Sequence, residues 1–184
     1  MSKKDMDVPL AELIGKVVKG IDLSAIESEA VFDRFMDGSA SEIEMAGLLA
    51  ALQTKGANHR EIAGGIRALR KAMVRIISLE PERLVDTAGT GGGTVTTFNI
   101  STAAALVAAG AGIPIAKHGN RSFTSRSGSA DVLEALGVDI DLNPERMGEI
   151  LEEVGIVFMF APLLHPAMRY VGPVRRTLGI TTIM

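Results

Sequence analysis

The chain has 184 residues, 47% of them hydrophobic, with a formal net charge of -3 at pH 7 and a pI near 5.7. This length and apolar content suffice for a buried core and exclude an intrinsically disordered chain. The slight acidity argues against binding to nucleic acid or to an anionic membrane, and the lack of cysteine excludes disulfides and thiolate metal sites. Neither a signal peptide nor a membrane span is evident, so we expect a cytoplasmic protein.

The first part of the chain has the pattern of several short helices. Apolar residues recur at helical spacing from Leu10 to Val18, and Gly56 is placed to end a later helix. Three helix starts carry the sequence of a capping box: Ser24 with Glu27, Ser41 with Glu44, and Asn58 with Glu61. We therefore predict a helical bundle over residues 8–77, within a helical domain at residues 1–78.

Beyond residue 79, alternating strands and helices predict an α/β domain at residues 79–184. Short apolar runs at 84–86, 113–116 and 156–160 predict strands, and Asn143-Pro144 predicts the start of a helix that Gly155 closes. The run 180–184 also has the character of a strand. This sheet would be incomplete, so the chain is expected to be a fragment or to need a partner that covers the sheet edge.

Residues 86–102, DTAGTGGGTVTTFNIST, place four glycines and several hydroxyls directly before a predicted helix. Glycine lets backbone amides approach a ligand closely, and a helix N-terminus attracts anions. The segment predicts an anion-binding loop, with an ordinary turn as the alternative. It is not a Walker loop, because Thr94 and not Lys follows Gly93. A dinucleotide fingerprint read from Gly89 would need Gly or Ala where Thr94 stands.

Further motifs follow in a fixed order. They are GTGG at 89–92, TFNIST at 97–102, KHGNR at 117–121, SGSADVLEALG at 127–137, FAP at 160–162, HPAMR at 165–169 and VRRTLG at 174–179. In these motifs the chain resembles the anthranilate phosphoribosyltransferases, tryptophan-pathway enzymes of the nucleoside-phosphorylase-like glycosyltransferase family. The resemblance covers essentially all of this chain, but only the amino-terminal part of the family's chain. It implies an amino-terminal helical bundle followed by an incomplete parallel-sheet α/β phosphoribosyltransferase domain.

The resemblance implies that the amine of anthranilate displaces diphosphate from C1 of 5-phosphoribosyl 1-diphosphate, with Mg²⁺ as cofactor. It implies a phosphoribosyl-diphosphate site formed by Gly89, Thr90, Gly91, Gly92, Thr97, Asn99, Ser101, Thr102, Lys117, Ser125 and Ser129, with Ser101 also a metal ligand. It implies an anthranilate site formed by His118, Asn120, His165 and Arg175. It also implies a homodimer formed through the helical domain, and it singles out no catalytic residue.

The residues themselves leave simpler roles open. Lys117 could be an ordinary solvated lysine, Ser101 a helix cap, and Asn120 a turn-stabilising residue. Arg175 could pair with a carboxylate in a two-point fork or lie on a solvated helix face. His118 and His165 match no zinc spacing, so we do not expect them to bind a metal.

Two departures from the family pattern bear on activity. The family continues GTGG with Asp-Gly, whereas this chain has Gly93-Thr94. The acidic pair with which the family binds magnesium lies in the portion that this chain does not match. The leading hypothesis is therefore the transferase, and the alternatives are a non-catalytic binding or dimerisation fragment of it and a pyrimidine nucleoside phosphorylase-like enzyme.

Overall fold

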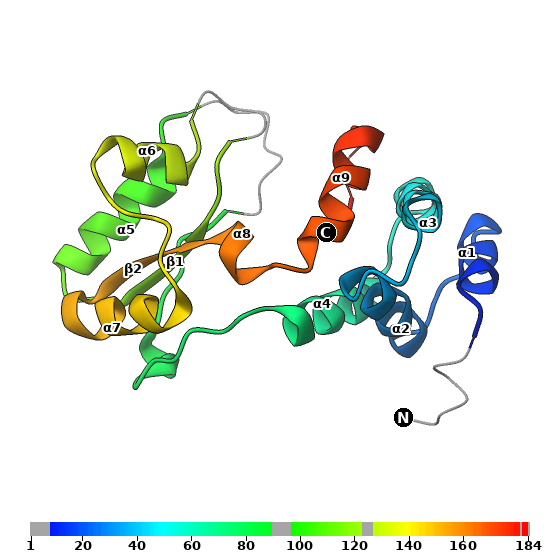
Figure 1. Ribbon diagram of the computed structural model, residues 1–184, viewed down its shortest axis with the longest axis horizontal. Helices are drawn as coiled ribbons and strands as arrows, with labels where there is room; N and C mark the ends of the chain where they lie inside the picture. The colour runs from blue at the N-terminus through cyan, green and yellow to red at the C-terminus, as the bar shows by residue number, and fades with distance from the viewer. Residues whose placement is uncertain (1–7, 90–96, 123–126, 181, 184) are drawn as a thin grey trace. The chain divides into compact units, whose positions relative to one another are not determined.

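The computed structural model describes residues 8–89, 97–122, 127–180 and 182–183 (Figure 1). The chain forms two compact units. One consists of Met1–Met73 together with His165–Met184, and the other of Val74–Leu164. The predicted order of a helical bundle followed by an incomplete parallel-sheet α/β domain is confirmed. No helix in the described ranges is long and apolar enough to cross a membrane.

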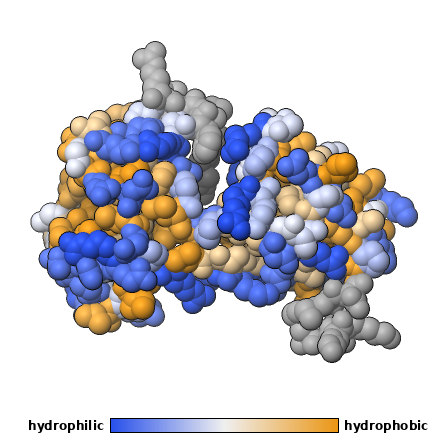
Figure 2. Space-filling model, in the orientation of Figure 1, coloured by the Kyte–Doolittle hydropathy of each residue, from blue (hydrophilic) through white to orange (hydrophobic). Residues whose placement is uncertain are grey.

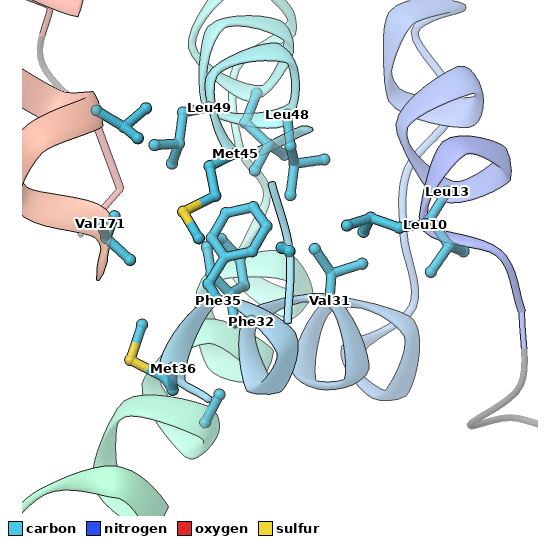
Figure 3. Close-up of a cluster of buried hydrophobic side chains, with 14 of the residues drawn as sticks. Leu10, Leu13, Val31, Phe32, Phe35, Met36, Met45, Leu48, Leu49 and Val171 are labelled. Atoms are coloured by element: carbon cyan, nitrogen blue, oxygen red, sulfur yellow. The ribbon is translucent and has the colours of Figure 1, made fainter. Parts of the chain in front are cut away.

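The first unit is a bundle of helices around one apolar core. Its helices are α1 (Leu10–Val18), α2 (Ala25–Met36), α3 (Glu42–Lys55), α4 (His59–Ala72) and, from the end of the chain, α9 (Met168–Leu178). Phe32 and Phe35 of α2 are fully buried at the centre of this core (Figure 3). Their rings meet edge to face, with the ring centroids 5.2 Å apart. Burying each such side chain contributes about 1.5–3 kcal/mol. Val171 and Val174 bring α9 into the same core.

All three predicted capping boxes form, with the side-chain and backbone bonds of each in place. The box at the start of α4 does more than cap a helix, because Glu61 is completely buried. Its carboxylate accepts hydrogen bonds from the backbone N–H of Leu23 at 3.0 Å and of Asn58 at 2.9 Å, and from Nζ of Lys55 at 2.9 Å. One side chain therefore connects the segment before α2, the end of α3 and the start of α4.

Helices α2 and α4 pack closely because α4 carries a glycine where they meet. A Cβ on Gly64 would lie 2.6 Å from both the carbonyl oxygen of Ala25 and Cβ of Ser28. The Ser28 hydroxyl crosses the same contact and donates to the backbone oxygen of Glu61 at 2.7 Å. The absence of a side chain at Gly64 thus fixes the separation of the two helices.

The second unit is built on two parallel strands, β1 (Ile115–Gly119) and β2 (Ile156–Phe160). Ile115 is in register with Ile156, and Val85 forms an isolated parallel bridge to Ile115. The remaining elements are η2 (Pro81–Arg83), α5 (Ile100–Gly110), α6 (Ser129–Ala135), α7 (Pro144–Val154) and α8 (Ala161–Leu164). The N–H of Val74 donates to the carbonyl of Leu164 at 2.8 Å, so the unit begins and ends at adjacent points.

The structure confirms some boundaries in this unit and corrects others. Strand β2 spans the predicted residues, and α7 starts at Pro144 after the Asn143 cap and ends at Gly155 in a left-handed conformation. The strand predicted at 84–86 is reduced to the Val85 bridge. The strand predicted at 113–116 starts later and continues to Gly119 as β1, because pairing with β2 extends that far.

The last strand prediction, at 180–184, is wrong for the residues that the structure describes. Ile180, Thr182 and Ile183 take no part in a strand. Ile183 instead packs against the core of the helical unit, after α9 has brought the chain back there.

Candidate phosphate-binding site

Lys117 is the centre of a polar cluster in the α/β unit. It lies in the middle of β1 with only 2% of its surface exposed. Its ammonium donates to the hydroxyl oxygens of Thr87 and Ser101, each at 3.3 Å. Among the described residues, no carboxylate pairs with it within 4 Å. Burial of a cation with only neutral partners costs free energy, and a bound anion would offset that cost.

Electrostatics at the cluster agree with this geometry. Burial lowers the pKa of Lys117 below the usual lysine value, and the nearby charge of Asp86 opposes the shift. Burial also lowers the pKa of His118, the next residue of β1. A phosphate group near Lys117 would favour the charged ammonium. The charge-assisted hydrogen bond between them would offset the free energy that burial of the ammonium costs.

Asp86 and Thr87 also belong to this cluster; they lie in the predicted anion-binding segment but are not among the predicted site residues. The Thr87 hydroxyl donates to the backbone oxygen of Ser101 at 2.8 Å. Oδ1 of Asp86 accepts the N–H of Ala88 at 2.9 Å and that of His118 at 3.3 Å. They connect the start of the glycine segment to α5 and β1. Their position at the end of a predicted strand, directly before the glycines, was the available signal, since ligands gather at the carboxyl ends of parallel strands.

The first turn of α5 brings further predicted residues together. Asn99 occupies the N-cap position, but its side chain does not cap the helix. Its amide instead donates to the backbone oxygen of Gly128 at 2.8 Å, just before α6. Thr102 is buried and donates from its hydroxyl to that of Ser129 at 3.1 Å. Polar groups from the starts of α5 and α6 therefore lie beside each other in the same unit as Lys117.

The other predicted phosphate residues are less informative. Gly89 and Thr97 are exposed, and the Thr97 hydroxyl donates to the backbone oxygen of Phe98 at 3.0 Å. The following lie outside the described residues: Thr90, Gly91, Gly92, Gly93 and Ser125.

The residues predicted to bind anthranilate are divided between the two units. His118 and Asn120 lie in the α/β unit, where Oδ1 of Asn120 accepts the N–H of Arg121 at 2.7 Å, as a turn-stabilising residue would. His165 and Arg175 lie in the helical unit. Nε of Arg175 is buried, and it has no hydrogen-bond partner among the residues described. Burial also lowers the pKa of Arg175, so this guanidinium too would gain from an anion.

The described residues do not fit a magnesium centre by themselves. They contain no group of three or more His, Cys, Asp or Glu side chains that could hold a metal ion. Oγ of Ser101, the predicted ligand, lies 3.3 Å from the Lys117 ammonium, which would repel a second cation.

Comparison with known proteins identifies the family. Residues 11–73 match the helical bundle domain of a glycosyl transferase family, and residues 81–184 match its a/b domain. The anthranilate phosphoribosyltransferase of Desulforamulus reducens is 51% identical over 174 residues, which make up 95% of this chain and 50% of that protein. The chain therefore spans about half the length of the curated relatives it matches.

Solved structures agree with this match. The crystal structure of anthranilate phosphoribosyltransferase from Thermus thermophilus superposes with a TM-score of 0.81 at 47% identity, covering 92% of this chain and 51% of that one. The Saccharomyces cerevisiae enzyme superposes with a TM-score of 0.84 at 29% identity, and the match covers 95% of this chain and 52% of the yeast chain. Both domain models are matched in order, and the chain thus belongs to this glycosyl transferase family, on its anthranilate phosphoribosyltransferase branch.

Proposed function

We propose that this chain provides the phosphoribosyl-diphosphate-binding half of an anthranilate phosphoribosyltransferase. The observation that carries the proposal is the buried Lys117 ammonium, which has two hydroxyl partners and no carboxylate among the described residues. The yeast relative was solved in complex with phosphoribosyl diphosphate and magnesium, and also with 4-fluoroanthranilate. These ligands suit a cluster of one cation and several hydroxyls.

The proposed reaction makes specific demands on these side chains. The amine of anthranilate attacks C1 of the ribose, the C1–O bond to diphosphate breaks, and negative charge develops on the leaving group. The new N-ribosyl amine then releases one proton to the diphosphate or to water. Lys117 would stabilise that charge, while hydroxyls of Ser101 and Thr102 hold oxygen atoms of the substrate. The arylamine is already nucleophilic, so the site needs positioning and charge stabilisation more than a strong base.

Binding of anthranilate is the less supported part of the proposal. The acid carries a carboxylate, and Arg175 has a buried Nε without a hydrogen-bond partner in the described chain. A guanidinium can hold a carboxylate by two parallel hydrogen bonds. We propose Arg175 for this role, and the family resemblance adds His118, Asn120 and His165 as further candidates.

We propose that the 184-residue chain binds diphosphate but turns over little or no substrate alone. The described residues do not hold magnesium by themselves, and the relatives have about as much chain again. Mg²⁺ would supply charge neutralisation for the leaving diphosphate, held mainly by oxygen atoms of the ligand.

Calorimetry with inorganic diphosphate tests the binding half of this proposal. Replacing Lys117 by Ala should weaken binding by about 1.5–3 kcal/mol, the usual value of a charge-assisted contact. Lys71→Ala is the matched control, because Lys71 lies in the helical unit and pairs with Asp33 at 2.7 Å. Absence of binding heat from a chain shown by circular dichroism to be folded would refute the proposal. If the Lys117→Ala variant binds diphosphate as tightly as the unchanged chain, Lys117 is not part of the site.

An assay for phosphoribosylanthranilate fluorescence tests the catalytic half. We expect no product above background from the purified chain with both substrates and magnesium. Turnover at an ordinary enzymatic rate, about 1–1000 per second, would show that this half is catalytically sufficient.

We also propose that the helical unit mediates a homodimer. A groove between α1 and α3 is lined by small and apolar residues, among them Val18, Gly47, Ala50 and Ala51. Val18 is 68% exposed, and Ile43, one turn of α3 before Gly47, is 85% exposed. An apolar surface of this kind on small helices suits a second copy.

A further inference from the structure

Two segments of the α/β unit cross closely at Gly128, the residue before α6. A Cβ on Gly128 would lie 2.4 Å from the backbone nitrogen of Ser122 and 2.6 Å from the carbonyl oxygen of Asn120. Gly128 has a φ of -88°, which any residue can adopt, so the close approach and not the backbone conformation requires glycine. The N–H of Ala130 donates to the same Asn120 oxygen at 3.3 Å. The KHGNR motif is thereby in contact with the start of α6.

Asp131 of α6 holds this crossing together. One oxygen of its carboxylate, Oδ2, accepts the N–H of Gly128 at 2.6 Å and that of Ser122 at 3.1 Å. The other oxygen, Oδ1, lies 3.5 Å from a guanidinium nitrogen of Arg121, which also pairs with Glu134. The hydrogen bonds from Gly128 and Ser122 hold the pKa of Asp131 below its usual value, so this side chain is charged at neutral pH.

Hydrogen bonds also connect the crossing to the cluster around Lys117. The carbonyl oxygen of Gly128 accepts from the side-chain amide of Asn99, at the start of α5, at 2.8 Å. The hydroxyl oxygen of Ser129 accepts from the Thr102 hydroxyl at 3.1 Å. Thr102 directly follows the serine whose hydroxyl oxygen accepts from the Lys117 ammonium at 3.3 Å. A displacement of Gly128 would therefore move polar groups of the proposed phosphate site.

We propose that Asp131 is a positioning residue for phosphate binding. By fixing Gly128, it holds the polar groups at the starts of α5 and α6 in place around Lys117. This role rests on the proposed function of the cluster. It also predicts a direction that charge alone would not, because removal of a carboxylate should by itself strengthen the binding of an anion such as diphosphate. Loss of positioning should weaken that binding instead.

Solvent screens the charges at this crossing. The side chains of Arg121, Asp131 and Glu134 are 48%, 34% and 39% exposed, and Figure 2 shows hydrophilic side chains beside apolar ones on the surface of the α/β unit. A change of one charge here should therefore alter diphosphate affinity only slightly. Glu134→Gln is the matched charge control, since it removes a carboxylate bound to Arg121 and leaves the bond between Asp131 and Gly128 intact.

Calorimetry with inorganic diphosphate on the 184-residue chain tests the proposal. Asp131→Ala should raise the dissociation constant about tenfold, whereas Glu134→Gln should leave it within about twofold. Gly128→Ala should weaken binding as well, because it displaces the crossing without removing a polar side chain. Gly110→Ala is the control for that variant, since its Cβ would meet no described residue within 4 Å.

Loss of a helix cap must be separated from loss of positioning, because the Asp131 carboxylate also caps α6. Asn143→Ala removes the cap of α7, whose side chain accepts the N–H of Arg146 at 2.8 Å. It should lower the Tm to a similar extent and leave diphosphate affinity unchanged. If Asp131→Ala does not fold, Asp131→Asn replaces it, since Asn keeps the size but turns an amide donor toward a guanidinium or loses an acceptor for an N–H.

Amide hydrogen exchange followed by NMR, without any ligand, reports on the crossing itself. The Gly128 N–H should exchange about tenfold faster in the Asp131 variant than in the unchanged chain. Unchanged exchange there, or equal or tighter diphosphate binding by a folded Asp131 variant, would overturn the proposal. An equal loss of affinity in Asn143→Ala would also overturn it, in favour of a general effect of stability. Failure of the unchanged chain to bind diphosphate would refute the proposed function and this role with it, whereas the other outcomes refute the role alone.

Discussion

The ammonium of Lys117 is buried with two hydroxyl oxygens for partners, and its charge is therefore solvated less well than it would be in water. Replacing it by Met keeps the length and removes the charge. We expect Lys117→Met to lose diphosphate binding and to stabilise the unliganded chain by about 1 kcal/mol, as removal of a strained functional group often does. Thermal unfolding and calorimetry measure the two effects, and a lower Tm for this variant would contradict the assignment.

Thr87 tests how the Lys117 ammonium is held in position. Thr87→Val keeps the shape but removes the oxygen that accepts from Lys117 and donates to the Ser101 carbonyl. We expect diphosphate affinity to fall by about 1 kcal/mol, which is roughly a fivefold change. Thr87→Ser, which retains the hydroxyl, should restore most of the affinity. A valine variant that binds as well as the original would show that Thr87 has no positioning role.

At the scale of the elements, local signals in the sequence were sufficient for part of the fold. The capping boxes, the left-handed end of α7 at Gly155 and the strand β2 each depend on residues a few positions apart, and each was predicted. The limits of β1 depend on its pairing with β2, forty residues away along the chain, and were predicted wrongly.

The same distinction applies to the candidate site. A glycine segment, a lysine and nearby hydroxyls can be found by motif, and the structure places Ser101 beside Lys117. Asn99 has the residue type and position of a helix cap, but a long-range contact with Gly128 uses its amide. Thr87 lies in the predicted anion-binding segment, but nothing local singles it out, because its role exists only once β1 and α5 are folded against that segment.

Glycines within the helices provide a test of packing between elements. Gly64→Ala would place Cβ 2.6 Å from the Ala25 oxygen, so α2 and α4 would have to separate. Gly15→Ala is a matched control in α1, where a Cβ meets no described residue within 4 Å. We expect destabilisation of about 1–3 kcal/mol for Gly64→Ala and stabilisation of about 0.5–1 kcal/mol for Gly15→Ala, measured by urea denaturation. Equal free energies of unfolding for the two variants would refute this account of the helix contact.

At the scale of the whole molecule, the exposed groove between α1 and α3 predicts self-association. Ile43→Glu should raise the dissociation constant of the dimer by about tenfold or more, because it places a charge in an apolar contact. Ile77→Glu, at a similarly exposed site in the α/β unit, should leave the dimer intact. Light scattering over a concentration series measures both. If the unchanged chain is monomeric at every concentration tested, the prediction of self-association is wrong.

The discontinuous helical unit has a consequence for the order of events during synthesis. Helices α1 to α4 leave the ribosome first, but Val171 and Val174, which complete their core, are made only after the whole Val74–Leu164 unit. About 90 residues separate the two parts, so at about 5–20 residues per second the early helices wait roughly 5–20 s for α9. During that interval the nascent bundle presents an open apolar face, which a ribosome-associated chaperone could shield.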